Sequence, residues 1–242
     1  CVTQTAEQGA NIARTSLLMA GFPDSVPGVT IDRQCGSSQQ AVHFAAQAIL
    51  AGDMDIVIAG GVESMSRVPM GSNMQHAHSS KRLQENYDII HQGLSAEKIA
   101  AKWSLSKEQL NNYAYQSHQR AISAIEAGHF KHEILPIQVP QEDGSMTTFA
   151  VDEGPRAETT IEILNGLKTV FQEDGVITAG NASQMSDGAS AVVVMALDKA
   201  QELGIQPLAK IVTRVVVGSD PTLMLTGPIE ATRKALERAG LN

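Results

Sequence analysis

The stretch IDRQCGSSQQAV, residues 31–42, carries the most informative local pattern in the chain. A short extended run, Val29 to Arg33, leads into Cys35, and a helical run without proline continues from Gln39 to Ala51. A second apolar run, DIVIA at residues 55–59, follows the helix. The order strand, cysteine, helix, strand predicts a βαβ unit. Cys35 is therefore expected on the turn between a strand and a helix N-terminus.

That position suits a nucleophile. A helix N-terminus offers unpaired N–H groups and a partial positive charge, which favour the thiolate. The thiolate is the reactive form of cysteine, and the small residues Gly36, Ser37 and Ser38 keep the approach to sulfur free of bulk. The alternative is a buried structural cysteine that behaves as a small hydrophobe. Local sequence leaves both interpretations open.

Composition limits the class of protein. The chain has 242 residues, enough for one large or two ordinary domains, with 43% apolar and 18% charged residues. Such a chain can bury a core, and its 4% aromatic share with 20 glycines suits packed α/β layers. The formal net charge of −8 argues against a nucleic-acid binder, which needs a basic face.

Cysteine usage predicts a reducing compartment. Only Cys1 and Cys35 are present, which makes neither a zinc motif nor a disulfide framework. The cytoplasm is the expected location, with an organellar matrix as the alternative. His76 and His78 lie in a polar stretch, but no carboxylate or cysteine has helpful spacing, so no metal site is predicted. No apolar stretch has the length of a membrane span.

Periodicity and turn residues predict the remaining elements. Gly60 and Gly61 are expected to close the strand that begins at residue 55, and the apolar run at 189–197 is expected to be a strand buried on both faces. The other expected elements are helices at 11–20, 95–103, 106–127, 198–203 and 228–239, a hairpin of strands 134–139 and 147–151, and a strand at 208–217. Gly52 is expected to end the helix that runs to Ala51, and Asp143-Gly144 to form the hairpin turn. Ser106 and Gln109 have the spacing of a capping box.

Two further sites have both a functional and a structural interpretation. The loop AGNASQMSDG, residues 179–188, is dense in small polar residues and could hydrogen-bond the amides of a ligand. It could equally be a turn rich in Asn and Asp. Arg156, beside another loop, could contact a phosphate or an adenine, or could simply be solvated.

Several segments together resemble a known family. They are CVTQTAEQGANIAR (1–14), QCGSSQQA (34–41), GGVESMSRVPM (60–70), EDGVITAGNASQMSDGASAVVV (173–194) and GSDPTLMLTGPIEATRKALERAG (218–240). In order and spacing they resemble the thiolases, the acetyl-CoA acyltransferases, over nearly the whole chain. The resemblance implies an α/β fold of thiolase type with α-β-α-β-α layers, here mostly its N-terminal half plus an inserted loop domain.

The resemblance also implies a domain plan. Residues 1–64 would form the first part of the N-terminal domain, which carries the nucleophile. Residues 65–176 would form the loop domain over coenzyme A, residues 177–205 the return to the N-terminal domain, and residues 206–242 the start of the C-terminal domain. Homodimers or homotetramers are expected of the family.

In thiolases the motif cysteine takes an acyl group from a 3-ketoacyl-CoA and releases acetyl-CoA. Free CoA then removes the acyl group, and the reverse reaction is a condensation. Cys35 matches this acyl-accepting residue, and its N–H would contribute to an oxyanion hole. Ser183 matches a contact to the pantetheine arm, and Arg156 a contact near the adenine and phosphates. Coenzyme A and acyl-CoA are expected as substrates, with no permanently bound cofactor. Met70, in RVPM, favours the degradative 3-ketoacyl-CoA type.

The departures from the family pattern matter as much. The family's general-base His lies in a Gly-His-Pro motif, its second Cys in Cys-x-Gly, and an Asn in Asn-Glu-Ala-Phe; none of these motifs occurs in the sequence. A nucleophile needs an activating base. We therefore expect a chain cut at both ends and inactive alone. The alternatives are a condensing enzyme of ketoacyl-synthase type and a non-catalytic CoA-binding fragment.

Overall fold

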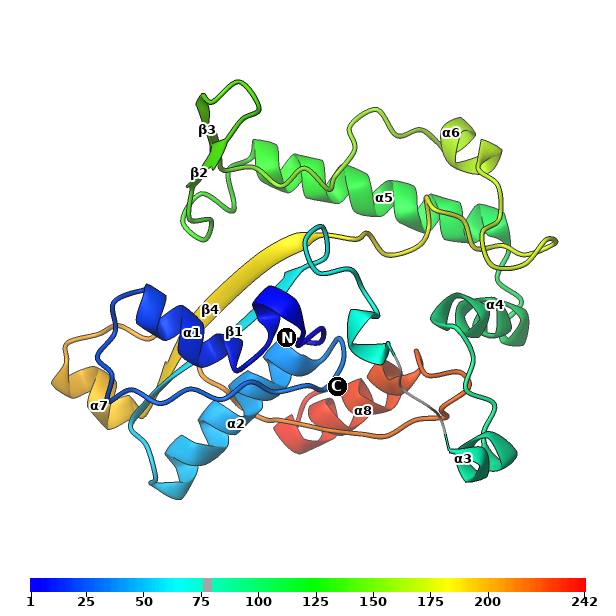
Figure 1. Cartoon of the computed structure of the whole chain (residues 1–242). Helices are drawn as coiled ribbons and strands as arrows, with labels where there is room; N and C mark the ends of the chain where they lie inside the picture. The colour runs from blue at the N-terminus through cyan, green and yellow to red at the C-terminus, as the bar shows by residue number, and fades with distance from the viewer. Residues whose placement is uncertain (76–79) are drawn as a thin grey trace. The chain divides into compact units, whose positions relative to one another are not determined.

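The computed structural model describes residues 1–75 and 80–242, so His76 and His78 lie outside the described residues. The chain forms two compact units. Unit 1 contains residues 1–83, 185–217 and 228–242, and unit 2 contains residues 84–184 and 218–227. The elements are labelled in Figure 1. Among the helices so described, none is long and apolar enough to cross a membrane.

Unit 1 is built around a ribbon of two antiparallel strands. Strand β1 (Ile56–Ser64) pairs with β4 (Asp187–Met195) from Ile56↔Met195 to Ser64↔Asp187. The predicted βαβ unit is wrong, because residues 26–33 form no strand and only one isolated bridge joins Arg33 to Cys35. The partner of β1 comes instead from a segment far along the chain.

Helix α2 (Ser37–Ala51) contacts both strands of the ribbon and runs along it in Figure 1. The helix begins two residues before the predicted Gln39 and ends as predicted at Gly52, whose left-handed φ of 79° suits glycine. The strand β1 does not stop at Gly60 and Gly61. A Cβ atom on Gly61 would lie 2.6 Å from the Cβ of Ser38, so the missing side chain allows α2 to approach the strand.

The expectation of a strand buried on both faces is also wrong. Val192 and Val193 of β4 are 51% and 59% exposed. Because the ribbon has only two strands in the described chain, α2 cannot shield both of its faces. The expected strand at 208–217 is likewise absent, since these residues form no strand in the structure.

Polar contacts join three of the sequence segments quoted above. The carboxylate of Glu63 accepts hydrogen bonds from the N–H groups of Val2 (2.8 Å) and Thr3 (3.1 Å) and from Nε2 of Gln8 (3.0 Å). Burial alone would raise the pKa of Glu63, but these hydrogen bonds outweigh it and lower the pKa. Asp187 accepts from the Ser66 N–H at 2.9 Å and from its hydroxyl, which lowers the pKa of Asp187.

The other elements of unit 1 are short or lie on its surface. They are η1 (Ala6–Gln8), α1 (Ile12–Met19), η2 (Ser72–Met74), α7 (Leu197–Glu202) and α8 (Gly227–Ala239). Helix α3 (Lys81–Asn86) spans the sequence boundary between the units. The predicted helices at 11–20, 198–203 and 228–239 are therefore confirmed, within one or two residues at their ends.

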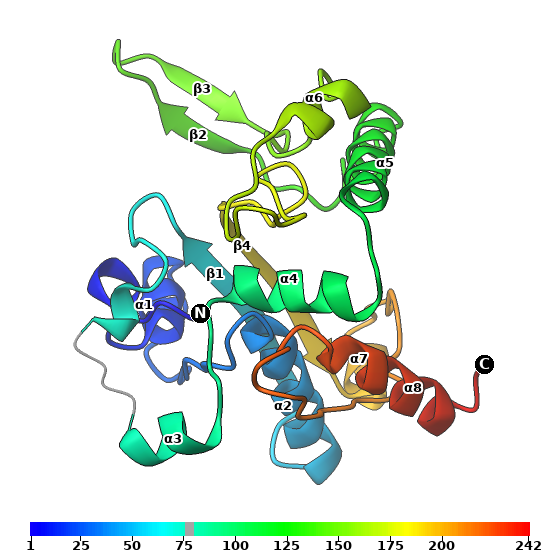
Figure 2. The ribbon, with the colours of Figure 1, turned by 90° about the vertical axis from the view of Figure 1, so that its right-hand side faces the viewer.

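Unit 2 contains the longest helix, α5 (Lys107–Glu126), with α4 (Gln92–Lys102) and α6 (Ile161–Gly166). Figure 2 shows α6 beside α5 and the hairpin of β2 (Ile137–Pro140) and β3 (Met146–Phe149), which confirms the predicted hairpin. The predicted capping box is present, because Ser106 and Gln109 each bond the backbone N–H of the other. Helix α4 starts before the predicted Ser95, since the His91 side chain caps it by accepting from Gly93 N–H.

Candidate active site

Cys35 lies on a tight turn that opens α2. Its side chain is exposed and its thiol is free. Gly36 is the N-cap residue, and the N–H of Gly36 donates to the carbonyl of Arg33 at 3.1 Å. The sequence prediction for the place of Cys35 at a helix N-terminus is thus met, although an extended segment rather than a strand precedes it. An exposed thiol at this end of a helix is accessible to an electrophile.

The residue before the cysteine has a strained backbone. Gln34 has a φ of 49°, a left-handed conformation that costs roughly 1 kcal/mol or more for a residue with a Cβ atom. Two side chains hold it there. Asp32 accepts from the Gln34 N–H at 2.8 Å, and the Ser37 hydroxyl donates to the Gln34 carbonyl at 2.6 Å. Ser37 also accepts from the Arg33 N–H at 2.8 Å and is buried.

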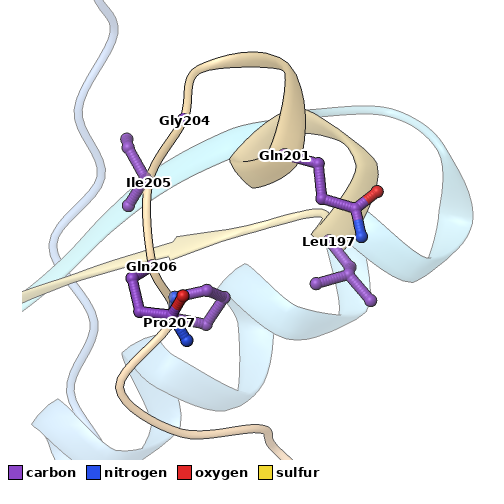
Figure 3. Close-up of a pocket in the computed structure, with 6 residues that line it drawn as sticks. All are labelled: Leu197, Gln201, Gly204, Ile205, Gln206 and Pro207. Atoms are coloured by element: carbon purple, nitrogen blue, oxygen red, sulfur yellow. The ribbon is translucent and has the colours of Figure 1, made fainter.

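Two hollows lie in unit 1. One, of about 220 Å³, is formed by the start of α2 with both strands of the ribbon, and is lined by Ser38, Gln39, Val42, Ala59, Gly60, Ser190 and Val192. The other, of about 560 Å³, is shown in Figure 3 at the end of α7 and in the segment after it. Its lining contains no ionisable group and none of the predicted site residues, so chemistry is not expected there.

His43 lies two turns along α2 from Cys35. It is buried, and its Nδ1 atom has no hydrogen-bond partner among the described residues. Burial lowers the pKa of His43, and the positive charges of Arg214 and Arg33 lower it further. The folded unit therefore favours the neutral form of the imidazole.

The other two predicted site residues both belong to unit 2. Arg156 and Ser183 have exposed side chains. Their loops are joined, because Nε2 of Gln184 donates to the carbonyl of Gly154 at 2.8 Å. A Cβ atom on Gly154 would lie 2.3 Å from Oε1 of Gln184, so a larger residue at position 154 would displace the Gln184 side chain. The structure thus brings the Arg156 and Ser183 loops together, while Cys35 belongs to unit 1.

Metal ligands do not gather in the described ranges. Among residues 1–75 and 80–242, no group of three or more His, Cys, Asp or Glu side chains could hold a metal ion.

Comparison with known protein families identifies the family to which the chain belongs. Residues 1–198 match the family model of the thiolase N-terminal domain. The chain belongs to the thiolase family. The resemblance inferred from the sequence is confirmed, and so is the α/β thiolase fold.

Similar proteins include acetyl-CoA acetyltransferases and 3-ketoacyl-CoA thiolases. The chain is 44% identical to an acetyl-CoA acetyltransferase of Pseudomonas aeruginosa, over 98% of the chain and 63% of that protein. It is 46% identical to a 3-ketoacyl-CoA thiolase of Aliivibrio fischeri, over 100% of the chain and 62% of that protein. The chain thus spans about three fifths of the length of these relatives.

A solved thiolase-family structure supports the same fold. The crystal structure of the Bacillus anthracis acetyl-CoA acetyltransferase has 43% sequence identity and a TM-score of 0.86. The match covers 99% of the chain and 63% of that structure.

Sequence reasoning missed a buried polar group in this thiolase-family chain. Glu97 of α4 and Asn111 of α5 contact the segment that precedes Ser183. Asn181 lies within a quoted motif, but nothing in the helical patterns distinguished Glu97 or Asn111 from surface residues.

Proposed function

We propose that the chain transfers acyl groups between coenzyme A thioesters through an acyl-cysteine at Cys35. The observation that carries this proposal is the exposed thiol on the turn that opens α2, in a chain of the thiolase family. Relatives named acetyl-CoA acetyltransferase and 3-ketoacyl-CoA thiolase support the same reaction class.

The covalent step is a thioester exchange. The Sγ atom of Cys35 attacks the thioester carbonyl carbon, a new S–C bond forms, and the bond from that carbon to the sulfur of CoA breaks. The proton of the Cys35 thiol leaves with the CoA thiolate as free CoA, so the step needs no oxidant or reductant. With a 3-ketoacyl-CoA, Sγ attacks the 3-keto carbon instead of the thioester carbon, and the new S–C bond forms there. The bond between C2 and C3 then breaks, the carbanion on C2 takes up the thiol proton, and acetyl-CoA leaves. In this proposal the N–H of Cys35 contributes to the oxyanion hole that stabilises the negatively charged oxygen.

Coenzyme A is proposed as a substrate rather than a permanent cofactor. Ser183 would contact its pantetheine arm and Arg156 its adenine and phosphates. The Gly154–Gln184 hydrogen bond supports this assignment, because it joins the two loops that carry these residues. In this proposal residues 1–64 and 177–205 form the N-terminal domain. The residues that separate them in the sequence, 65–176, form the loop domain that covers coenzyme A. Residues 206–242 begin the C-terminal domain.

We propose homodimers or homotetramers in the cytoplasm, which sedimentation and fractionation would test. Cys1 and Cys35 are both free thiols, which fits a reducing compartment. The sequence has no Gly-His-Pro or Cys-x-Gly motif, so this polypeptide alone is expected to be acylated slowly and not to complete turnover.

The test is the intact mass of the chain after incubation with acetyl-CoA or acetoacetyl-CoA. An acetyl increment on the wild type, and none on Cys35→Ala, is the expected result. Cys1→Ala serves as the matched control, because it removes the other free thiol and should still be acetylated. Acetylation of Cys35→Ala, or of neither the wild type nor Cys1→Ala, would contradict the proposal.

A further inference from the structure

A buried carboxylate holds the segment that leads to Ser183. Glu97 of α4 is 7% exposed. Its oxygens accept hydrogen bonds from the N–H of Val176 at 2.9 Å and from the N–H of Ile177 at 2.9 Å. Gly175 makes room for this contact, since a Cβ atom there would lie 2.2 Å from Oε1 of Glu97. Hydrogen bonds to a charged acceptor are roughly twice as strong as neutral ones, so this is a firm attachment.

A chain of amides holds the other end of the same segment. Asn111 of α5 is 0% exposed, and its Oδ1 atom accepts from Nδ2 of Asn181 at 2.9 Å. The same Nδ2 donates to the Val176 carbonyl at 3.0 Å, and Oδ1 of Asn181 accepts from the Thr178 N–H at 2.8 Å. Asn111 in turn donates to Oδ1 of Asn165, in α6, at 2.8 Å.

The two attachments fix residues 176–181 from both ends. Thr178 is 0% exposed and Ile177 is buried, so the segment is well packed. Ser183 itself is exposed and lies two residues after Asn181. The rigid part of the loop therefore ends immediately before the side chain that the ligand would meet.

We propose that Asn111 and Glu97 are positioning residues that set Ser183 for the pantetheine arm of coenzyme A, an inference that rests on the function proposed above. They act through the 176–181 segment and touch no reacting atom. Any buried Asn could stabilise the unit without such a role, so the test must separate positioning from stability.

The experiment is calorimetric titration of the full chain with CoA and, separately, with adenosine 3′,5′-bisphosphate, which lacks the pantetheine arm. Asn111→Ala and Ser183→Ala should each weaken CoA binding by about tenfold, the size of one lost hydrogen bond in a buried site. Both should bind the bisphosphate as the wild type does. Asn112→Ala, one position along α5, is the matched control and should bind CoA normally.

Two further variants sharpen the result. The double variant Asn111→Ala/Ser183→Ala should bind CoA no more weakly than whichever single variant binds it less well. The reason is that both changes remove the same interaction with CoA. Asn111→Asp keeps an oxygen to accept from Asn181 and should restore CoA binding, whatever it does to stability. Additive losses, or no rescue by Asp, would overturn the positioning role.

The remaining outcomes separate this inference from the proposed function. If Ser183→Ala weakens CoA binding and Asn111→Ala does not, the positioning role is wrong and the function stands. If the wild type binds no CoA, the proposed function falls and the inference falls with it. Hydrogen exchange gives an independent check: the amides of residues 176–184 should exchange faster in Glu97→Gln than in the exposed control Glu108→Gln, and equal rates would refute the attachment itself.

Discussion

The hydroxyl of Ser37 donates a hydrogen bond of 2.6 Å to the carbonyl oxygen of Gln34, across the turn that carries Cys35. The same hydroxyl accepts from the Arg33 N–H, so one buried side chain satisfies two backbone groups of the turn. The shape of this turn therefore depends on a residue two positions after Cys35.

Ser37→Ala should destabilise unit 1 by about 1–3 kcal/mol, because it leaves the Arg33 N–H without its hydrogen-bond partner. The Gln34 carbonyl loses the hydroxyl but keeps the backbone N–H of residue 37, at 3.0 Å, as a donor. The substitution should also change the rate at which iodoacetamide alkylates Cys35, followed on the Cys35 peptide by mass spectrometry. Ser38→Ala is the control, since Ser38 is exposed and makes none of these bonds. Equal stability and alkylation in the two variants would show that Ser37 does not hold the turn.

Gln34→Gly should stabilise the chain by up to about 1 kcal/mol, because glycine adopts a positive φ without the steric penalty that Gln34 incurs. Gln39→Gly, within the first turns of α2, should destabilise it by roughly 0.5–1 kcal/mol. Urea unfolding of both variants is the measurement. Destabilisation by Gln34→Gly as large as that by Gln39→Gly would argue against strain at Gln34.

Gly61→Ala should loosen the packing of α2 on the ribbon. The new methyl group would lie 2.6 Å from the Cβ of Ser38, and overpacking of this kind costs about 1–3 kcal/mol. Gly188→Ala, in the facing strand, is a matched control because its Cβ meets nothing within 4 Å. Faster hydrogen exchange across α2 in Gly61→Ala alone is expected, and the double variant Ser38→Gly/Gly61→Ala should reverse it.

His43 should make unit 1 sensitive to acid. The folded-state pKa of His43 lies below its ordinary value of 6.5, so between these two values the unfolded chain binds more protons than the folded one. Its contribution to stability is complete above pH 6.5 and is lost as the pH falls towards the folded pKa. Hydrogen exchange of α2 peptides, measured between about pH 7 and pH 5 and corrected for intrinsic rates, should show this loss.

His43→Gln should flatten that dependence, because glutamine does not titrate. His132→Gln is the control, since His132 is exposed and belongs to unit 2. A pH dependence that is the same in all three proteins would assign the acid sensitivity to other groups.

Local signals in the sequence predicted local structure well. The capping box at Ser106, the Gly52 helix end and the Asp143-Gly144 hairpin turn each follow from a few neighbouring residues, and the structure contains all three. The place of Cys35 at the start of a helix was predictable for the same reason, since glycine, serine and a helical run follow it directly.

Long-range partners were not predictable from pattern alone. Nothing within residues 29–59 shows that β1 pairs antiparallel with β4 rather than with the segment before Cys35. The burial of β4 was overestimated. An apolar run shows that its side chains favour a buried environment, but it does not show how many neighbouring strands will cover them. Glu97 and Asn111 were missed because their partners lie 79 and 70 residues away, beyond any helical period.

The pairing of β1 with β4 also sets an order of events on the ribosome. Ser66 and Asp187 lie at the end of the ribbon where β1 finishes and β4 begins, and they are 121 residues apart in the sequence. At about 5–20 residues per second, some 6–24 seconds pass between the synthesis of the first strand and the arrival of the second. Most of unit 2 emerges in that interval and can fold first. Throughout it, β1 remains a nascent strand with no partner, which makes this period the natural point for a chaperone to engage the chain.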